Sequence, residues 1–424
     1  MKCQRPRGTY DIIGKDFQYF DRIFEVCQKQ AQFYGFERIE TPIFEDAEIF
    51  NRGVGAGTDI VEKEMYLLKG EGEQVLALRP EATASIARAY IENGLTNLPK
   101  PVKLWCFGTF FRHEKPQAGR FRQFWQVDFE ALGRKSPVID VEIIQLFYSI
   151  FQKLGLKNLM THVNSIGCPK CRGRYIKTLK SYLKSYQSNL CRDCRRRLKT
   201  NPLRVLDCKK EKCEKVLKES PQILDSLCKK CRAHLKEVLE LLEALEIPYR
   251  LDPYLVRGLD YYNRTVFEIF FNKENKEEGK VALVGGGRYD DLVKILGGVP
   301  TPACGGAAGV ERLISLLKEQ EIKLPQEEKP NIFLAQLGES AKGKALQLFE
   351  ELRRANILTA EDLSRDSLRV QLARANRLGV KYVLILGQKE VIENEVILRD
   401  MENKTQESIK MEKVVSEIKK KLKS

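Results

Sequence analysis

The chain has 424 residues, of which 43% are hydrophobic, 9% aromatic and 31% charged, and its net charge is 73 − 58 = +15. This composition is typical of a folded protein of two to four domains and excludes a disordered or fibrous chain. The N-terminus, MKCQRPRGTYDI, has no apolar core, and no apolar run reaches membrane-spanning length, so we expect a cytoplasmic protein without a membrane partner.

The N-terminal part of the chain mixes helix and strand patterns. Residues 17–33 have helical periodicity, and residues 38–44 predict a strand that Pro42 interrupts. Residues 104–112 and 123–132 predict two strands joined by a polar, glycine-containing loop. We therefore expect an antiparallel hairpin with a long basic loop.

Positive charge is concentrated in the next segment. Residues 168–236 contain 21 basic and 6 acidic residues, an excess of 21 − 6 = +15. The rest of the chain contains 52 basic and 52 acidic residues. A basic patch confined in this way predicts contact with a phosphate backbone. The alternative is a solvated charged face, which accounts for many Lys/Arg runs.

Eight of the 12 cysteines lie in this basic segment. Disulfides are disfavoured in a reducing cytosol, whereas pairs of C-x-x-C knuckles supply four thiolates to tetrahedral Zn²⁺. The first two knuckles have ribbon-like spacing, and we predict one structural zinc ion at Cys168, Cys171, Cys191 and Cys194. A looser second site would comprise Cys208, Cys213, Cys228 and Cys231. The alternative is a set of free or redox-active thiols, because spacing does not show that the pairs converge.

Strand patterns return after the cysteine segment. Residues 237–245 predict a helix, and residues 266–271 and 281–284 predict strands, the second closed by the glycines at 285–287. A Gly- and Ala-rich helix is expected to begin near Gly305. These elements belong to a mainly antiparallel α/β body.

A polar linker over residues 323–331 precedes a change of pattern. Alternating strands and helices then predict a small α/β module, with elements at 332–336, 344–354, 382–386 and 414–422.

Familiar catalytic motifs are absent from the sequence. It contains no G-x-S-x-G, no H-E-x-x-H and only 3 histidines, which leaves little material for a triad or a histidine metal site. The string from Gly338 to Lys344 nearly matches a P-loop, but Ala345 stands where a hydroxyl would hold Mg²⁺. We interpret this string as an ordinary strand-to-helix turn.

Three separated arginines stand in unusual contexts: Arg112 ends a predicted strand, Arg257 begins the string RGLDYY, and Arg312 follows an acid on a Gly-rich helix. A nucleoside triphosphate over an antiparallel sheet needs fixed positive charge, which guanidinium groups provide. A surface salt bridge explains each arginine taken alone. Their joint occurrence indicates a triphosphate site.

Three strings resemble the class motifs of class II aminoacyl-tRNA synthetases. Residues 107–124, FGTFFRHEKPQAGRFRQF, resemble motif 2; residues 309–313, GVERL, resemble motif 3; and residues 41–45, TPIFE, resemble motif 1.

Two further strings resemble the signature peptides of histidyl-tRNA synthetases. They are LVRGLDYYNRTVF at residues 255–267 and GGGRYD at residues 285–290. Residues 79–83 and 201–207 are similar to that family as well, and the resemblance covers essentially the whole chain.

The resemblance implies an α/β fold with an antiparallel-sheet class II catalytic domain. This domain would occupy residues 1–165 and 246–325, interrupted by a basic cysteine-rich insertion at 166–245 that lies over the tRNA acceptor stem, and an α/β anticodon-binding domain would occupy 326–424. The implied activity is histidine–tRNA ligation. Histidine attacks the α-phosphate of ATP to give histidyl-adenylate and pyrophosphate, and is then transferred to the 3′ end of tRNA(His). Members are homodimers joined through motif 1.

The resemblance also implies roles at the ATP site. Arg112 would contact the α-phosphate and Arg312 the γ-phosphate, and Glu114 would hold ATP near the adenine. Arg257 would lie between the α-phosphate and the histidine carboxylate. Mg²⁺ would arrive with the β- and γ-phosphates.

The histidine site carried over from the family has two partners for the imidazole, Glu130 and Tyr262, because the ring needs both a donor and an acceptor. The alternative for Glu130 is a rim ion pair with an arginine. The remaining histidine-binding residues would be Glu81, Thr83, Arg112, Gln126, Arg257, Tyr261 and Tyr289.

Some positions depart from the commonest family pattern, namely Ala82, His113, Trp125 and the pair at 307–308. They lie beside the contact residues, so we expect them to affect packing rather than the reaction.

Two other functions fit parts of the sequence. A catalytically silent relative, the regulatory subunit of histidine biosynthesis, shares the catalytic fold, but it lacks the C-terminal module and loses signature residues. A nucleic-acid-binding zinc protein without catalysis accounts for the insertion and leaves the three arginines unexplained.

Overall fold

The computed structural model describes residues 3–55, 57–115, 119–273, 280–322, 324 and 328–423. The chain divides into two compact units, Met1–Leu324 and Pro325–Ser424. Part of the motif 2 string, 116–118, and of the predicted linker, 323 and 325–327, lies outside the described residues. Among the residues described, none of the helices combines the length and the apolar character needed to cross a bilayer. The predicted boundaries of the insertion inside the first unit stay predictions.

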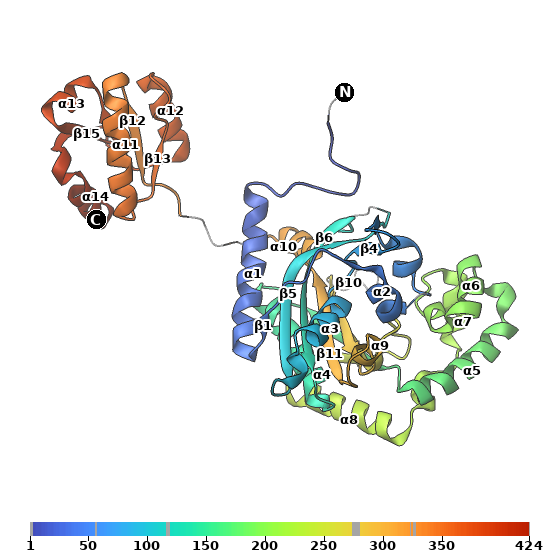
Figure 1. The fold of residues 1–424 in the computed structure, drawn as a ribbon. Helices are drawn as coiled ribbons and strands as arrows, with labels where there is room; N and C mark the ends of the chain where they lie inside the picture. The colour runs from blue at the N-terminus through green and yellow to red at the C-terminus, as the bar shows by residue number, and fades with distance from the viewer. Residues whose placement is uncertain are drawn as a thin grey trace. The chain divides into compact units, whose positions relative to one another are not determined.

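The first unit is built on one long sheet (Figure 1), whose strands lie in the order β1-β5-β6-β11-β10-β9-β7-β8. Neighbours are antiparallel except at the two edges, where β1 with β5 and β7 with β8 are parallel. The strands are β1 (Glu37–Arg38), β5 (Val102–Phe111), β6 (Gln123–Leu132), β7 (Leu159–Ser165), β8 (Tyr249–Leu251), β9 (Asn263–Asn272), β10 (Lys280–Arg288) and β11 (Ala303–Gly309). The predicted hairpin is confirmed as β5 and β6.

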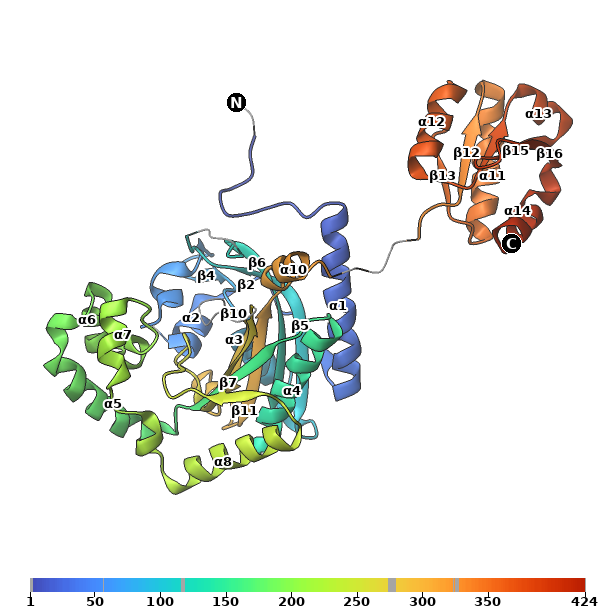
Figure 2. The same cartoon turned by 180° about the vertical axis from the view of Figure 1, so that it is seen from behind.

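Helices cover one face of this sheet, and an apolar core lies between them and the strands. Phe20 and Phe147 from the helices meet Trp105 and Phe129 from the strands in this core. The helices are α1 (Lys15–Tyr34), α4 (Pro137–Lys153), α8 (Lys229–Ala244) and α10 (Val310–Glu319), and Figure 2 shows them from behind.

The opposite side of the sheet carries smaller elements and a second core, in which Phe50, Ile86 and Leu292 are buried. A small sheet in the order β2-β4-β3 belongs to this side. The elements are β2 (Phe44–Asp46), α2 (Ala47–Phe50), β3 (Leu67–Lys69), β4 (Val75–Leu78), α3 (Thr83–Glu92) and α9 (Leu292–Ile295).

The side chains of strand β6 point alternately to the two faces of the sheet, and over residues 126–131 they are apolar on one face and polar on the other. Val127, Phe129 and Ala131 point into the first core. Because successive side chains of a strand point to opposite faces, Gln126, Asp128 and Glu130 face the other side. The polar residues of this strand are therefore presented together on one face.

The cysteine-rich insertion is helical (Figure 1). Its helices are α5 (Pro169–Ser185), α6 (Arg192–Thr200) and α7 (Glu211–Lys218), and α8 returns the chain to the sheet. Helix α8 begins at Lys229, well before the predicted start at residue 237.

The helix predicted near Gly305 is wrong, because residues 303–309 form strand β11 and helix α10 begins only at Val310. The residues here are small because neighbouring side chains pack closely against the strand, not because the segment is helical. A Cβ atom at Gly305 would lie 1.5 Å from Oε2 of Glu130, which reaches across from β6.

Two strand boundaries also differ from the prediction. The glycines at 285–287 lie inside β10 instead of closing it. A Cβ at Gly285 would meet Nη1 of Arg257 at 2.2 Å, so glycine lets this arginine lie against the sheet. The strand predicted over residues 38–44 is split between β1 and β2, which belong to different sheets.

The second unit is the predicted α/β module. Its sheet has the order β13-β12-β14-β15-β16, parallel among the first three strands and antiparallel at the last two pairings. Prediction missed β13, α12, α13, β15 and β16. The elements are β12 (Ile332–Gln336), α11 (Glu339–Arg354), β13 (Thr359–Glu361), α12 (Leu368–Leu378), β14 (Tyr382–Leu386), α13 (Gln388–Glu393), β15 (Glu395–Asp400), β16 (Gln406–Lys410) and α14 (Val414–Lys423).

Candidate active site

A cavity of about 500 Å³, here called the active-site cavity, lies on the polar face of β6. Arg112, Arg257 and Arg312 all line it, although they are far apart in the sequence. Strand β5 ends just before the first, a loop after β8 carries the second, and α10 carries the third. The sheet therefore brings together the three arginines that the sequence singled out.

Acids and phenols form one group in and beside this cavity. Glu81 is buried and accepts hydrogen bonds from the backbone N–H groups of Thr83, at 3.0 Å, and Ala84, at 2.8 Å, at the start of α3. The Tyr261 hydroxyl donates to the same carboxylate at 3.2 Å. We call Glu81, Asp128, Glu130, Tyr261, Tyr262 and Tyr289 the acid-and-phenol group.

Glu130 is fully buried, and both of its oxygens are occupied. The Thr83 hydroxyl donates to Oε1 at 2.6 Å, and the Tyr289 hydroxyl donates to Oε2. Glu130 and Tyr289 are not among the residues that line the cavity, whereas Thr83 and Tyr262 are. Glu130 therefore lies behind Thr83, which lines the cavity and donates a hydrogen bond to the Glu130 carboxylate.

Burial raises the pKa of the carboxyl groups of Glu81, Asp128 and Glu130. The physical cause is the loss of water around a charge, and the three acids also repel one another. A cation entering this part of the cavity would offset that repulsion. The group is therefore suited to a ligand with a positive charge or several N–H donors.

Two polar atoms of β6 have no hydrogen-bond partner within the described part of the chain, Oε1 of Gln126 and Oδ1 of Asp128. Both residues line the cavity, and Asp128 is only 1% exposed. Buried polar atoms are normally paired, so these oxygens are available to a ligand. Asp128 is not among the predicted site residues, although the alternation of Gln126, Asp128 and Glu130 on one strand places all three on the same face.

The arginine side chains are held by backbone oxygens and by aromatic rings. Nε of Arg112 donates to the Pro80 carbonyl at 2.9 Å, and its guanidinium lies 5.3 Å from the centre of the Phe124 ring. Nη1 of Arg312 donates to the Ala282 carbonyl at 3.2 Å. These bonds leave other guanidinium N–H groups for an anion.

Acids are interleaved with the arginines. Arg257 pairs with Glu268, and Arg120 donates to Glu114 at 3.2 Å. Burial is the main cause that lowers the pKa of Arg312, and the neighbouring positive charge of Arg120 adds to it. We call Arg112, Arg120, Arg257 and Arg312 the arginine group.

One wall of the cavity comes from the insertion. Arg197, Arg204 and Asp207 line it, and so does Asp59 from the catalytic body. Nη2 of Arg197 lies 3.0 Å from Oδ2 of Asp59, and Nη2 of Arg204 lies 3.6 Å from the same oxygen. Sequence analysis did not identify these residues as part of the site, because no local pattern links residue 59 to residues 197–207.

The cysteines form two clusters whose pairing differs from the prediction. One comprises Cys168, Cys171, Cys228 and Cys231, and the other Cys191, Cys194, Cys208 and Cys213. The predicted set of Cys168 and Cys171 with Cys191 and Cys194 is wrong. The physical reason is tertiary, since the N-termini of α5 and α8 meet where the insertion leaves and rejoins the sheet.

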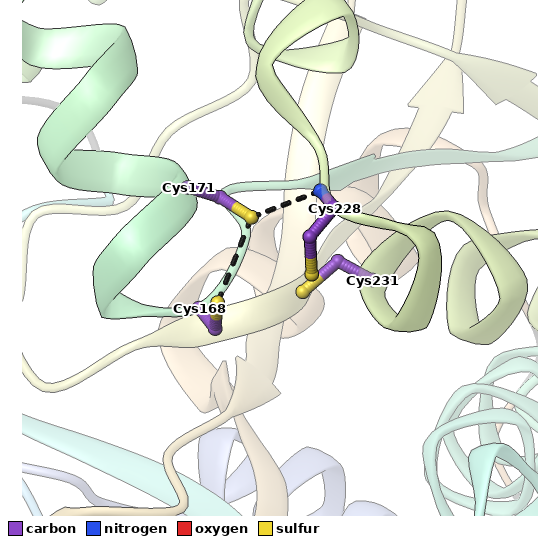
Figure 3. Close-up of side chains that lie close together, drawn as sticks. All are labelled: Cys168, Cys171, Cys228 and Cys231. Atoms are coloured by element: carbon purple, nitrogen blue, oxygen red, sulfur yellow. Dashed lines mark hydrogen bonds between the residues drawn. The ribbon is translucent and has the colours of Figure 1, made fainter.

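The sulfur atoms of each cluster lie within 4.8 Å of one another. Figure 3 shows the first cluster, in which the sulfurs of Cys168 and Cys171 are 3.6 Å apart and the backbone N–H of Cys228 donates to the Cys171 sulfur at 3.1 Å. A tetrahedral site with Zn–S bonds of about 2.3 Å needs sulfurs about 3.8 Å apart. Both clusters therefore have the donor set and the spacing for Zn²⁺.

Comparison with known proteins agrees with this geometry. A family model described as histidyl-tRNA synthetase matches residues 8–313, and one described as anticodon binding domain matches residues 331–421. The chain belongs to the histidyl-tRNA synthetase family. Synthetases of this family carry out a two-step aminoacylation, and the class uses ATP and Mg²⁺, so the chain is an aminoacyl-tRNA ligase of class II.

Similar proteins cover nearly the whole chain. The histidine–tRNA ligase of Dehalococcoides mccartyi is 43% identical over 99% of this chain and all of its own length, and that of Acetivibrio thermocellus is 42% identical with the same coverage. The apo histidyl-tRNA synthetase of S. aureus superposes with a TM-score of 0.80 at 33% identity, covering 98% of this chain and 99% of that one. These matches confirm the predicted fold class and family.

Proposed function

We propose that the active-site cavity binds histidine at the acid-and-phenol group and ATP at the arginine group, and that it joins histidine to tRNA(His). The observation that carries this proposal is the convergence of Arg112, Arg257 and Arg312 on one cavity beside buried acids. A surface salt bridge at each arginine, the alternative weighed from sequence, would not need that convergence.

In the first step the histidine carboxylate attacks the α-phosphorus of ATP, and pyrophosphate leaves. The nucleophile is already an anion, so no general base is required, and catalysis consists of positioning and charge stabilisation. Arg112 holds the α-phosphate and Arg312 the γ-phosphate. Arg257 binds between the α-phosphate and the attacking carboxylate, and Glu114 holds the adenine end.

Mg²⁺ supplies further charge neutralisation when it enters with the β- and γ-phosphates. The carboxylates of Glu64 and Glu268 line the cavity beside the arginines and would offer the hard oxygen ligands that this ion prefers. In the second step a ribose hydroxyl of the tRNA 3′ end attacks the activated carbonyl, and AMP leaves.

Histidine recognition is divided between the two ends of the amino acid. We assign the imidazole end to Tyr262, which lines the cavity, and to Glu130, which lies behind Thr83. A carboxylate oxygen that already accepts one bond has a second lone pair free for the ring N–H. Glu81, Thr83 and Gln126 bind the α-amino and carboxylate end, with Tyr261 and Tyr289 closing the site. Asp128 offers its Oδ1, which is buried without a partner among the described residues, to the α-ammonium group. The positive charge of the ammonium would counteract the burial that raises the pKa of this carboxyl.

Structural Zn²⁺ in both cysteine clusters is part of this proposal. Cys168, Cys191 and Cys228 are each the N-cap residue of a helix, where the positive end of the helix dipole stabilises a thiolate. Four thiolates around one Zn²⁺ form a closed, structural site with no open coordination position.

The proposed assembly is a homodimer through motif 1. Ile43 and Phe44 in that region are 48% and 56% exposed, which leaves apolar surface for a second copy to cover. Sedimentation would give the mass of two chains. A cytoplasmic location stays a prediction from the sequence.

Histidine-dependent exchange of pyrophosphate into ATP tests the proposed function. We expect exchange with histidine and background exchange with other amino acids, and charging of tRNA(His) when it is added. A catalytically silent relative, or a zinc protein that only binds nucleic acid, would show no exchange, and that result would overturn the proposal.

A further inference from the structure

One of the contacts between the insertion and the catalytic body is made by a short stretch of chain between Cys194 and Cys208. Arg197 and Arg204 of this stretch reach Asp59. Asn201 lies between them, and its Nδ2 donates to Oδ1 of Asp260 at 2.7 Å. We call Arg197 and Arg204 the arginine wall, since both line the active-site cavity.

Cysteines of the second cluster, Cys194 and Cys208, lie at the two ends of this stretch. Cys194 and Arg197 are three residues apart on α6, so they lie on the same side of the helix. At the other end, Cys208 directly follows Asp207, which accepts from Nη1 of Arg204 at 3.2 Å. The sulfurs at the two ends lie within 4.8 Å of each other.

The stretch between these cysteines is built from short pieces. Helix α6 spans only Arg192–Thr200, and Pro202–Val205 is a single 3₁₀ turn. The Asn201 N–H donates to the Arg197 carbonyl at 2.8 Å, Nη1 of Arg197 donates to the Arg204 carbonyl at 3.3 Å, and Leu198 and Val205 are buried in the second core. A metal that ties the two ends together would remove much of the conformational freedom that remains in this loop.

The arginine wall differs from the arginine group in the chain segment that carries it and in the residues with which it pairs. In the proposed function, Arg112, Arg257 and Arg312 bind the triphosphate. The arginine wall belongs to the insertion, which carries the net positive charge of the chain. The 3′ end of tRNA must enter the same cavity and brings phosphates with it. Arginine forks suit such phosphates.

We propose that Zn²⁺ in the cluster of Cys191, Cys194, Cys208 and Cys213 holds the arginine wall against Asp59, and that the wall positions the 3′ end of tRNA for the transfer step. This inference rests on the proposed function. The cysteines and Asp59 act as positioning residues, because their proposed effect on the tRNA is exerted through the two arginines that they hold.

The test separates the two steps of the reaction in a variant that loses half of the cluster. In Cys208→Ser/Cys213→Ser we expect the zinc content to fall from about two ions per chain to about one. The kcat/KM for tRNA charging should fall at least about tenfold, and pyrophosphate exchange by less than about threefold. Cys3→Ser is the matched control, since Cys3 is exposed and outside both clusters; it should leave zinc and both rates unchanged.

Asp59→Asn provides a second test that leaves every cysteine in place. Asn keeps the shape of the side chain and removes the charge that holds Arg197 and Arg204. We expect the same selective loss of tRNA charging, with about two zinc ions still bound. This variant decides the matter if the double cysteine variant does not fold.

Three results would overturn the inference: normal tRNA charging after loss of the zinc, no zinc in the second cluster of the wild type, or equal losses in both steps in Asp59→Asn. Failure of the proposed function is a different result, the absence of histidine-dependent pyrophosphate exchange in the wild type.

Discussion

The acid-and-phenol group and the arginine group share one cavity but are built differently. Glu81, Glu130 and Tyr289 are 4%, 0% and 1% exposed. Glu130 accepts hydrogen bonds from Thr83 and Tyr289, and Glu81 accepts one from Tyr261. The side chains of Arg112 and Arg257 are each 21% exposed and pair with nearby acids. Recognition of a small side chain needs a rigid, desolvated pocket, whereas a triphosphate needs arginines that can exchange their acid partners for phosphate.

Arg257→Ala should have the largest effect, because this residue serves both the α-phosphate and the attacking carboxylate in the proposed mechanism. Loss of one such donor costs about 10²–10³ in rate, and we expect the upper end in pyrophosphate exchange. Arg257→Lys keeps the charge but loses the fork and should recover part of the activity. A loss below about tenfold in the alanine variant would remove Arg257 from the transition state.

Glu130→Gln tests the rigid pocket. The amide has a single oxygen acceptor, whereas the carboxylate accepts from Thr83 and Tyr289 on different oxygens. We expect kcat/KM for histidine to fall about 10²-fold with the KM for ATP within about threefold. An equal rise in both KM values would show that the acid supports the whole cavity instead of the histidine end.

Glu311 is an acid beside the arginine group. Its pKa is set by burial and not by pairing with an arginine. Burial raises its pKa to about 7, and its Oε1 accepts from the Tyr10 hydroxyl and the Trp125 backbone N–H, both at 2.8 Å. The folded-state pKa lies above the unfolded value, so the stability this group contributes is present below about pH 4.5 and is lost as the pH rises through about 7.

Glu311→Gln retains the accepting oxygen and removes the titration. Relative to wild type, the variant should gain about 2 kcal/mol of unfolding free energy between about pH 5.5 and 8.5. Chemical denaturation at the two pH values measures this difference. Parallel pH profiles for the two proteins would mean that Glu311 keeps an ordinary pKa.

Asp128→Asn should have the smallest effect. The variant keeps the shape of the side chain and removes the charge proposed to face the α-ammonium group, so the KM for histidine should rise about tenfold. Inhibition by imidazolepropionate, which lacks the amino group, should not change. Equal weakening of both ligands would place Asp128 away from the ammonium group.

Much of the fold and of the candidate site could be predicted from local sequence. The alternation in β6 and the arginines at 112, 257 and 312 are visible because strand period and motif spacing are properties of neighbouring residues. The Gly- and Ala-rich composition near Gly305 predicts the start of a helix, whereas the structure has strand β11 there. Nothing local indicates that Glu130 from another strand occupies the space above Gly305.

The available residues follow from the sequence alone: eight cysteines in a basic segment, three arginines and a strand with polar residues at alternate positions. Which of these residues meet depends on the tertiary fold. The cysteines group by where α5 and α8 return to the sheet, and Arg197 finds Asp59 across 138 positions of sequence. Contacts between distant segments depend on how whole elements pack, and residue spacing carries no information about that packing.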